Sequence, residues 1–173
     1  KLETVSLPDN LIRIGDFTFS GCFVLKETKL PATLKQIGEH AFSDCAKLDD
    51  IVLPQGITDI GVGAFQRCTQ LSSVVIPSGM TEIRERTFSG CEALAEVTLP
   101  DGIQKIGEAA FAHTLLSSVD IPASVKSIAD NMFNNCFSLW NRLKKETDDE
   151  LWQSQFLQSL DVPTLEKALY SIK

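Results

Sequence analysis

Cysteine and histidine are the residue types in this chain that could bind a metal, form disulfides or act as nucleophiles and bases. The chain has five cysteines and two histidines, His40 and His113. Zinc sites place such residues in short motifs such as CxxC or HExxH, and neither histidine stands in one. The sequence also has no glycine-rich phosphate loop and no GxSxG element of hydrolases. We therefore expect no metal, no cofactor and no catalytic residue, which means that the chain is not an enzyme.

The spacing of the cysteines belongs to a repeat that runs through most of the chain. Cys22, Cys45, Cys68 and Cys91 recur every 23 residues, and the fifth cysteine is Cys136. A Leu/Ile-Pro pair and a phenylalanine keep the same step, with a last step of 22 residues. The pairs begin at Leu7, Leu30, Leu53, Ile76, Leu99 and Ile121, and the phenylalanines are Phe19, Phe42, Phe65, Phe88, Phe111 and Phe133. In the fifth repeat His113 or Thr114 takes the cysteine position. A unit this short cannot bury its own apolar face, so neighbouring copies must stack.

Each unit shows three local patterns of apolar residues. In the third unit Ile51 and Leu53 are two residues apart, which predicts a strand with alternate side chains inward. Pro54 ends this strand because it has no N–H group to donate. The isoleucines at 57 and 60 then turn the chain back, and residues 64–68 fit a single helical turn with phenylalanine and cysteine on one face.

Stacked units would bring the cysteines close to one another. Their Cα atoms would lie about 5 Å apart in neighbouring coils, a distance that a disulfide could tolerate. Parallel, inward-pointing side chains rarely reach the dihedral angle of a disulfide, however, and five in one column cannot all pair. We interpret the cysteines as buried free thiols that act as small apolar fillers.

An acidic residue follows the glycine position in five of the six units, at Asp16, Glu39, Glu85, Glu108 and Asp130. These acids stand at the start of the predicted helical turn, where free N–H groups and the helix dipole favour negative charge. We interpret them as caps of the turns. The alternative is a functional ladder of acids along one edge.

The repeat resembles a known family. Residues 48–53 (LDDIVL) fit the LxxLxL segment of leucine-rich repeats, and residues 30–45 (LPATLKQIGEHAFSDC) closely resemble the Treponema-type or BspA-like subclass. The resemblance extends from residue 2 to about residue 139. It implies an α/β solenoid, in which a right-handed coil carries a parallel β-sheet on its concave face and short strands and helical turns on the other side. Arg84 and Ala129 depart from the pattern at the glycine position, and Thr28 departs at an apolar strand position.

The chain divides into two predicted parts. Residues 1–139 form the leucine-rich-repeat solenoid of about six 23-residue repeats, and residues 140–173 form a helical C-terminal segment. In this segment Trp152, Phe156 and Leu160 follow one another at the spacing of a helix face. We interpret the segment as a cap on the last coil, with a helical module that contacts a partner as the alternative. We interpret the start of the chain as lying within a longer protein, with more repeats upstream.

Composition excludes several kinds of partner. A formal net charge of −7 argues against a nucleic-acid interface, and no apolar run approaches the roughly 20 residues of a membrane-spanning helix. The sequence begins without a signal peptide. Members of the family that it resembles are surface or secreted proteins of bacteria and some protozoa, associated with adhesion to host proteins or other cells. The resemblance therefore implies a cell-surface or secreted location.

The residues that the stack does not bury are the candidates for binding. In the middle of the predicted sheet, outward-pointing valines and threonine form one column and acids and serine form the next. An apolar strip edged by acids suits a protein surface with basic residues. The alternative is that exposed β-branched residues merely favour strand formation. We predict a partner-binding surface formed by Lys29, Asp50, Val52, Ser73, Val75, Glu96, Thr98 and Asp120.

The sequence thus predicts a non-catalytic protein-binding module of a bacterial surface or secreted adhesion protein. Its partner would be a protein, such as a host extracellular-matrix or cell-surface protein. The alternative functions are a structural spacer and a recruiting arm within a larger multidomain protein.

Overall fold

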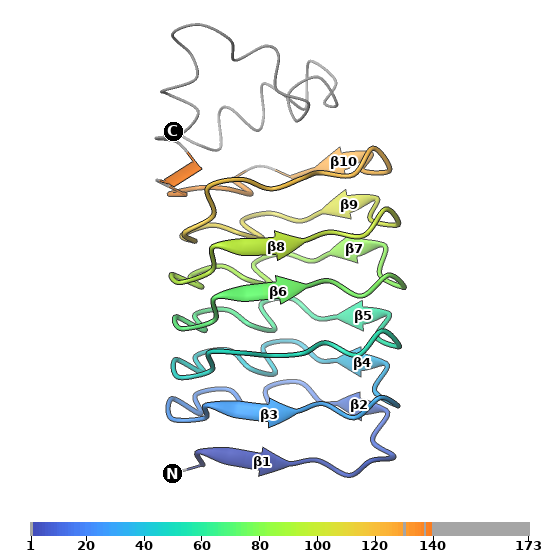
Figure 1. The fold of residues 1–173 in the computed structure, drawn as a ribbon, viewed down its shortest axis with the longest axis vertical. Coiled ribbons are helices and arrows are strands. Elements are labelled where there is room, and N and C mark those ends of the chain that lie inside the picture. Colours follow the sequence, from blue (N-terminus) through green and yellow to red (C-terminus); the bar gives the residue numbers. More distant parts are fainter. Residues whose placement is uncertain (1, 130, 137, 140–173) are drawn as a thin grey trace, which may run out of the picture.

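The computed structural model describes residues 2–129, 131–136 and 138–139 of the chain. Its regular elements are ten short strands (Figure 1). They are β1 (Thr4–Ser6), β2 (Arg13–Ile14), β3 (Glu27–Lys29), β4 (Gln36–Ile37), β5 (Asp59–Ile60), β6 (Ser73–Val75), β7 (Glu82–Ile83), β8 (Glu96–Thr98), β9 (Lys105–Ile106) and β10 (Ser127–Ile128). The predicted helical segment 140–173 lies outside the described residues, so the division into two domains stays a prediction.

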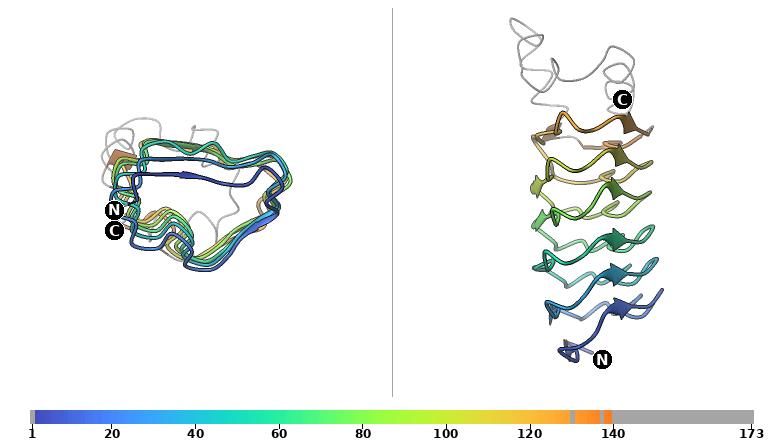
Figure 2. Two further views of the ribbon diagram at one scale, coloured as in Figure 1. Left: turned by 90° about the horizontal axis from the view of Figure 1, so that it is seen from below. Right: turned by 90° about the vertical axis from the view of Figure 1, so that its right-hand side faces the viewer.

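All strand pairs are parallel and join equivalent positions of successive coils. Thr4 pairs with Glu27 and Ser73 pairs with Glu96, a step of 23 residues, whereas Lys105 pairs with Ser127, a step of 22 residues. Viewed along the stack, the coils superpose with only small displacements (Figure 2). The sequence repeat therefore becomes a spatial repeat, and the predicted solenoid of stacked parallel strands is confirmed.

A continuous stack of phenylalanine rings occupies the core. The six rings lie face to face, with centroid distances that rise from 5.1 Å between Phe19 and Phe42 to 6.1 Å between Phe111 and Phe133. Leucine, isoleucine and cysteine columns surround the rings, and most of these side chains are fully buried. Numbered by their phenylalanines, the coils are coil 1 (Phe19) to coil 6 (Phe133).

The strands lie on two sides of the coil. β1, β3, β6 and β8 lie on the side where the sequence predicts strands, but the equivalent segments of coils 3 and 6 are not strands. The expected single sheet is therefore split into the pairs β1–β3 and β6–β8. The second side carries the ladders β2–β4–β5 and β7–β9–β10, which agree with the short strands that the family resemblance implies on this side.

The predicted helical turns are wrong. Each segment around the phenylalanine is a series of tight turns, because its backbone N–H groups alternate between two partners. The Phe42 N–H donates to the Ala64 carbonyl of the next coil (2.8 Å), whereas the Ser43 N–H donates within the turn to His40 (3.1 Å). Left-handed residues at His40 (φ 49°) and Asp44 (φ 61°) produce this alternation. A helix would direct its N–H and C=O groups along its own axis, so it would not make this series of hydrogen bonds to the next coil.

Asp16, the first of the acids after the glycine position, does not cap a helix. Asp16 Oδ1 accepts a hydrogen bond from the Glu39 N–H of the next coil (3.0 Å) and another from Arg13 of its own coil (3.2 Å). The carboxylate therefore connects two coils. Asp130 lies outside the described residues.

Thr114 occupies the cysteine position of the fifth coil. Its hydroxyl donates to the Phe111 carbonyl (2.9 Å) and lies 3.3 Å from the Cys136 thiol. His113 instead occupies the preceding left-handed position (φ 58°) and is exposed. A hydroxyl that bonds within its own turn thus takes the place of a thiol.

Thr28, which departs from the repeat at an apolar strand position, is a weak point of the core. Its side chain points inward from the middle of β3, and its hydroxyl is buried without a hydrogen-bond partner among the described residues. A buried polar group without a partner destabilises a protein by about 1–3 kcal/mol. We expect Thr28→Val, which keeps the shape and removes the hydroxyl, to raise the free energy of unfolding by about 1 kcal/mol. Urea denaturation of both chains measures this difference, and an unchanged or lower stability would show that the hydroxyl is satisfied.

Candidate binding surface

The side of the coil that carries β1, β3, β6 and β8 is called the strand face here. The middle residue of each strand is the least exposed and its two neighbours point outward, as the burial of Glu27, Thr28 and Lys29 shows. The strand pairing and the repeat place the outward residues in two columns. The first contains Thr4, Glu27, Asp50, Ser73, Glu96 and Ser118, and the second contains Ser6, Lys29, Val52, Val75, Thr98 and Asp120.

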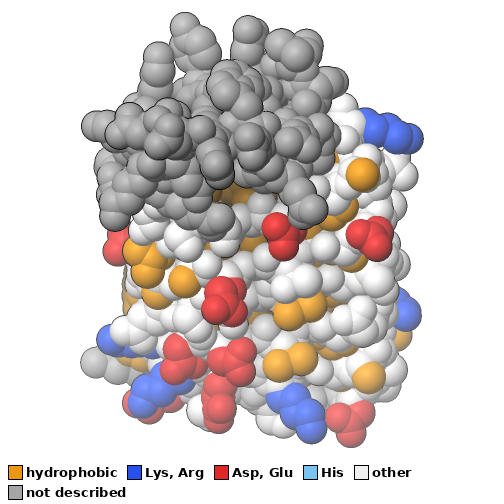
Figure 3. Space-filling model, turned by 45° about the horizontal axis from the view of Figure 1, so that its top comes forward, with side chains coloured by type: hydrophobic (Ala, Val, Ile, Leu, Met, Phe, Trp, Pro, Cys, Tyr) orange, Lys and Arg blue, Asp and Glu red, His pale blue; other side chains and the backbone are white. Residues whose placement is uncertain are grey.

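All eight residues predicted for binding are exposed and belong to these two columns. Val52 and Val75 are neighbours in the second column, with 75% and 56% of their surfaces exposed. On this side of the molecule, hydrophobic side chains lie beside a group of acidic ones (Figure 3). The structure therefore brings the predicted residues to one surface, although it interrupts the sheet beneath Val52.

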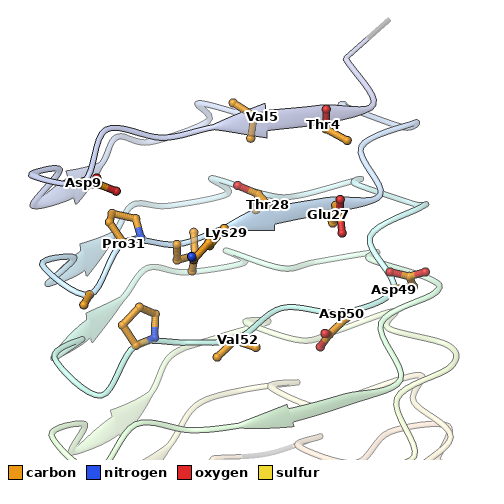
Figure 4. A pocket seen from close by; sticks show the side chains of 13 residues that line it. Thr4, Val5, Asp9, Glu27, Thr28, Lys29, Pro31, Asp49, Asp50 and Val52 are labelled. Atoms are coloured by element: carbon orange, nitrogen blue, oxygen red, sulfur yellow. The ribbon is translucent and has the colours of Figure 1, made fainter.

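A groove of about 920 Å³ crosses coils 1 to 3 on the strand face (Figure 4). Three of the predicted residues, Lys29, Asp50 and Val52, line it. The remaining lining residues are Thr4, Val5, Asp9, Glu27, Thr28, Leu30, Pro31, Ala32, Asp49 and Pro54. The charged groups of the groove are thus four carboxylates and one ammonium group.

The charges of the groove are not neutralised by neighbours. Six ion pairs form among the described residues, and all of them lie between other side chains. One of these ion pairs joins Arg67 to Asp44 through two hydrogen bonds, of 2.6 and 2.7 Å. These hydrogen bonds hold the pKa of Asp44 below its usual value. Glu27, Asp49 and Asp50 have no such partner in the described part of the chain, and their negative charge faces solvent.

The thiols that suggested chemistry in the sequence lie away from this surface. All five are free; Cys22 is half-buried and the other four are buried. Burial raises the pKa of the Cys45 and Cys91 thiols to about 12, so both are protonated at neutral pH. Cys45 donates its S–H to the Phe19 carbonyl of the preceding coil (3.2 Å), and Cys68 and Cys91 repeat the contact. These side chains serve packing, since nucleophiles and metal ligands need the thiolate.

The histidines also contribute to packing between coils. The His40 ring stacks on Phe17 at 5.2 Å, and His113 lies within 3.5 Å of the Asn135 amide. Over the described residues, no cluster of His, Cys, Asp and Glu has the arrangement of a metal site. Within the same ranges, no helix is long and apolar enough to cross a membrane.

Sequence reasoning missed part of the groove. Glu27 and Asp49 occupy outward positions that the repeat defines, but they were not among the eight chosen residues. Asp9, Pro31 and Pro54 lie past the end of each predicted strand, where the sequence gives no sign that they border a hollow. Glu27 and Asp50 occupy equivalent positions of neighbouring repeats, and this spacing could have predicted that the acids lie close together.

Comparison with protein families finds one matching family model. It describes a BspA type leucine-rich repeat region and matches in six copies, over residues 1–91 and 64–168. A comparison with curated proteins finds no match.

Solved structures of bacterial leucine-rich repeat proteins are similar to this chain. A leucine-rich cell surface protein of Faecalibacterium prausnitzii is 39% identical over 79% of the chain and 37% of its own, with a TM-score of 0.77. The leucine-rich repeat protein of T. pallidum is 37% identical over 62% of the chain and 50% of its own, with a TM-score of 0.58. A leucine-rich repeat protein of Bacteroides ovatus is 30% identical over 78% of the chain and 41% of its own, with a TM-score of 0.60. The chain thus spans half or less of the length of each.

Proposed function

The chain belongs to the BspA-type leucine-rich repeat family, and we propose that it is a non-catalytic protein-binding module of a bacterial cell-surface or secreted recognition protein. We propose a host extracellular-matrix or cell-surface protein as the partner. The similarity to a cell surface protein of Faecalibacterium prausnitzii supports the location.

The exposed valine pair on the strand face carries the proposal. Isolated exposed apolar residues are ordinary, but Val52 and Val75 stand in adjacent coils of one column, each more than half exposed. Their neighbours in the other outward column are Asp50 and Ser73, which are polar and exposed. An apolar centre with a polar rim is the usual composition of a protein–protein interface.

The second side of the coil supplies positions for a control. The outward position before each strand of that side holds Ile12, Lys35, Thr58, Thr81, Gln104 and Lys126, which are polar in five of six coils. Lysine already occurs in this column, at positions 35 and 126. The column therefore supplies control positions where an added positive charge leaves the fold intact.

We expect Val52→Lys combined with Val75→Lys to weaken partner binding at least tenfold, because two lysines replace the apolar centre of the interface. The control is Thr58→Lys combined with Thr81→Lys, which adds the same charge on the other side of the coil. Binding of both chains and the parent to a panel of purified extracellular-matrix and cell-surface proteins is measured by surface plasmon resonance, with circular dichroism to verify the fold.

Equal affinity of the valine variant and the parent for every partner would refute the proposed surface. Equal losses in both variants would show a general charge effect. If the folded parent bound no protein of the panel, a passive spacer would be favoured instead.

A further inference from the structure

We infer that the groove over coils 1 to 3 binds an extended, cationic segment of a partner protein in which basic and apolar residues alternate. This inference rests on the proposed function, since it specifies the partner of the same face.

The charge of the groove selects a cationic ligand. Asp9, Glu27, Asp49 and Asp50 face a single cation, Lys29, and none of the five forms an ion pair with another described residue. Carboxylates that have no internal partner attract lysine and arginine, and hollowed surfaces strengthen that attraction. A chain of net charge −7 adds attraction over a longer range.

The two long sides of the groove differ in chemistry. Glu27, Asp49 and Asp50 lie on one side, Val52 and Lys29 lie in the centre, and Pro31 and Asp9 lie on the other side (Figure 4). The side with three carboxylates therefore suits basic side chains, whereas Val52 and Pro31 suit small apolar ones. Among the lining residues there is no aromatic ring on which a sugar could stack.

An extended polypeptide is the ligand shape that meets both sides at once. Successive side chains of an extended chain point in opposite directions. A segment that lies along the stack would direct every second side chain toward the acids and the others toward Val52 and the prolines. Coils spaced by about 4.8 Å make three coils roughly 10 Å long, which three to four extended residues span.

The experiment uses three eight-residue, fluorescein-labelled peptides and the whole chain. One peptide alternates arginine and valine, the second has the same composition in two blocks, and the third alternates glutamate and valine. We expect the alternating cationic peptide to bind at least tenfold more tightly than the other two in fluorescence anisotropy. Its affinity should fall when NaCl is raised from 50 to 500 mM, because salt screens exposed charges.

Two matched variants locate the binding site. Glu27→Gln, Asp49→Asn and Asp50→Asn together remove three groove charges and keep the side-chain shapes. Glu39→Gln, Glu92→Gln and Glu108→Gln remove three exposed charges elsewhere. We expect the groove variant to bind the alternating cationic peptide at least tenfold more weakly, and the control variant to bind it within twofold of the parent.

Several results would overturn the inference. These are equal binding of the blocked and alternating cationic peptides, equal losses in the two variants, or no binding of the cationic peptide at low salt. A different result would refute the proposed function: equal binding of protein partners by the parent and the valine variant. Protein binding that depends on the valines but not on the groove acids would leave the proposed function standing and remove this inference alone.

Discussion

Phe65→Ala is expected to lower the free energy of unfolding of the chain by about 3–5 kcal/mol. The Phe65 ring is fully buried and packs between the rings of Phe42 and Phe88, at 5.3 and 5.5 Å. Its neighbours are held by strand ladders and cross-coil hydrogen bonds, so they cannot collapse into the cavity that alanine leaves. Urea denaturation followed by far-ultraviolet circular dichroism measures the loss.

Phe17→Ala is the matched control for this prediction. Phe17 also stacks on a ring of the next coil, His40, but 59% of its surface is exposed. We expect a loss of less than about 1 kcal/mol, since little apolar area leaves solvent contact when this ring packs. Similar losses at both positions would contradict the assignment of the phenylalanine column as the core of the solenoid.

The phenylalanine column could be predicted because a fixed sequence step becomes vertical stacking in any solenoid. Once Phe42, Phe65 and Phe88 share one step, only one geometry buries all of them. The same argument correctly gave the inward positions of the strand face and the buried thiols. It required no knowledge of the local backbone conformation.

The backbone of the turns could not be predicted in this way. Two columns of left-handed residues run through the coils. One holds Phe17, His40, Gly63, Arg86, Ala109 and Asn131, and the other holds Gly21, Asp44, Arg67, Gly90, His113 and Asn135. Glycine, the usual sign of such a conformation, occurs once in the first column and twice in the second. Hydrogen bonds between coils impose the conformation on the other residues, and such bonds are not visible in one unit of sequence.

The candidate binding surface likewise has a part that the sequence predicts and a part that it does not. Which residues point outward on the strand face follows from strand alternation, and Val52 and Val75 were placed correctly for that reason. The groove depends instead on how the chain leaves the strand at Pro31 and Pro54, and on the missing strand of coil 3. Both are consequences of contacts between coils, so the repeat pattern alone does not define them.

Gly61→Ala is expected to destabilise the chain by about 2–3 kcal/mol, the upper part of the usual range for overpacking. A Cβ atom at this position would lie 2.5 Å from the Glu39 nitrogen and 2.6 Å from the Gly38 carbonyl carbon of the preceding coil. These are backbone atoms, which cannot rotate away as a side chain would. The φ angle of Gly61 is not in the left-handed region, so close approach of two coils, and not backbone conformation, requires glycine here.

Gly79→Ala is the control, because a Cβ there would meet its nearest atom, the Ile57 carbonyl oxygen, at an ordinary 3.4 Å. We expect its stability in urea denaturation to lie within about 0.5 kcal/mol of the parent. Arg84 and Ala129 occupy the Gly61 position in coils 4 and 6, so a side chain can be accommodated where neighbouring coils adjust. The loss at Gly61 therefore measures how firmly coils 2 and 3 are held together. A Gly61→Ala chain as stable as the Gly79→Ala chain would mean that coil spacing is adjustable throughout, and that the repeated glycine has no structural role in it.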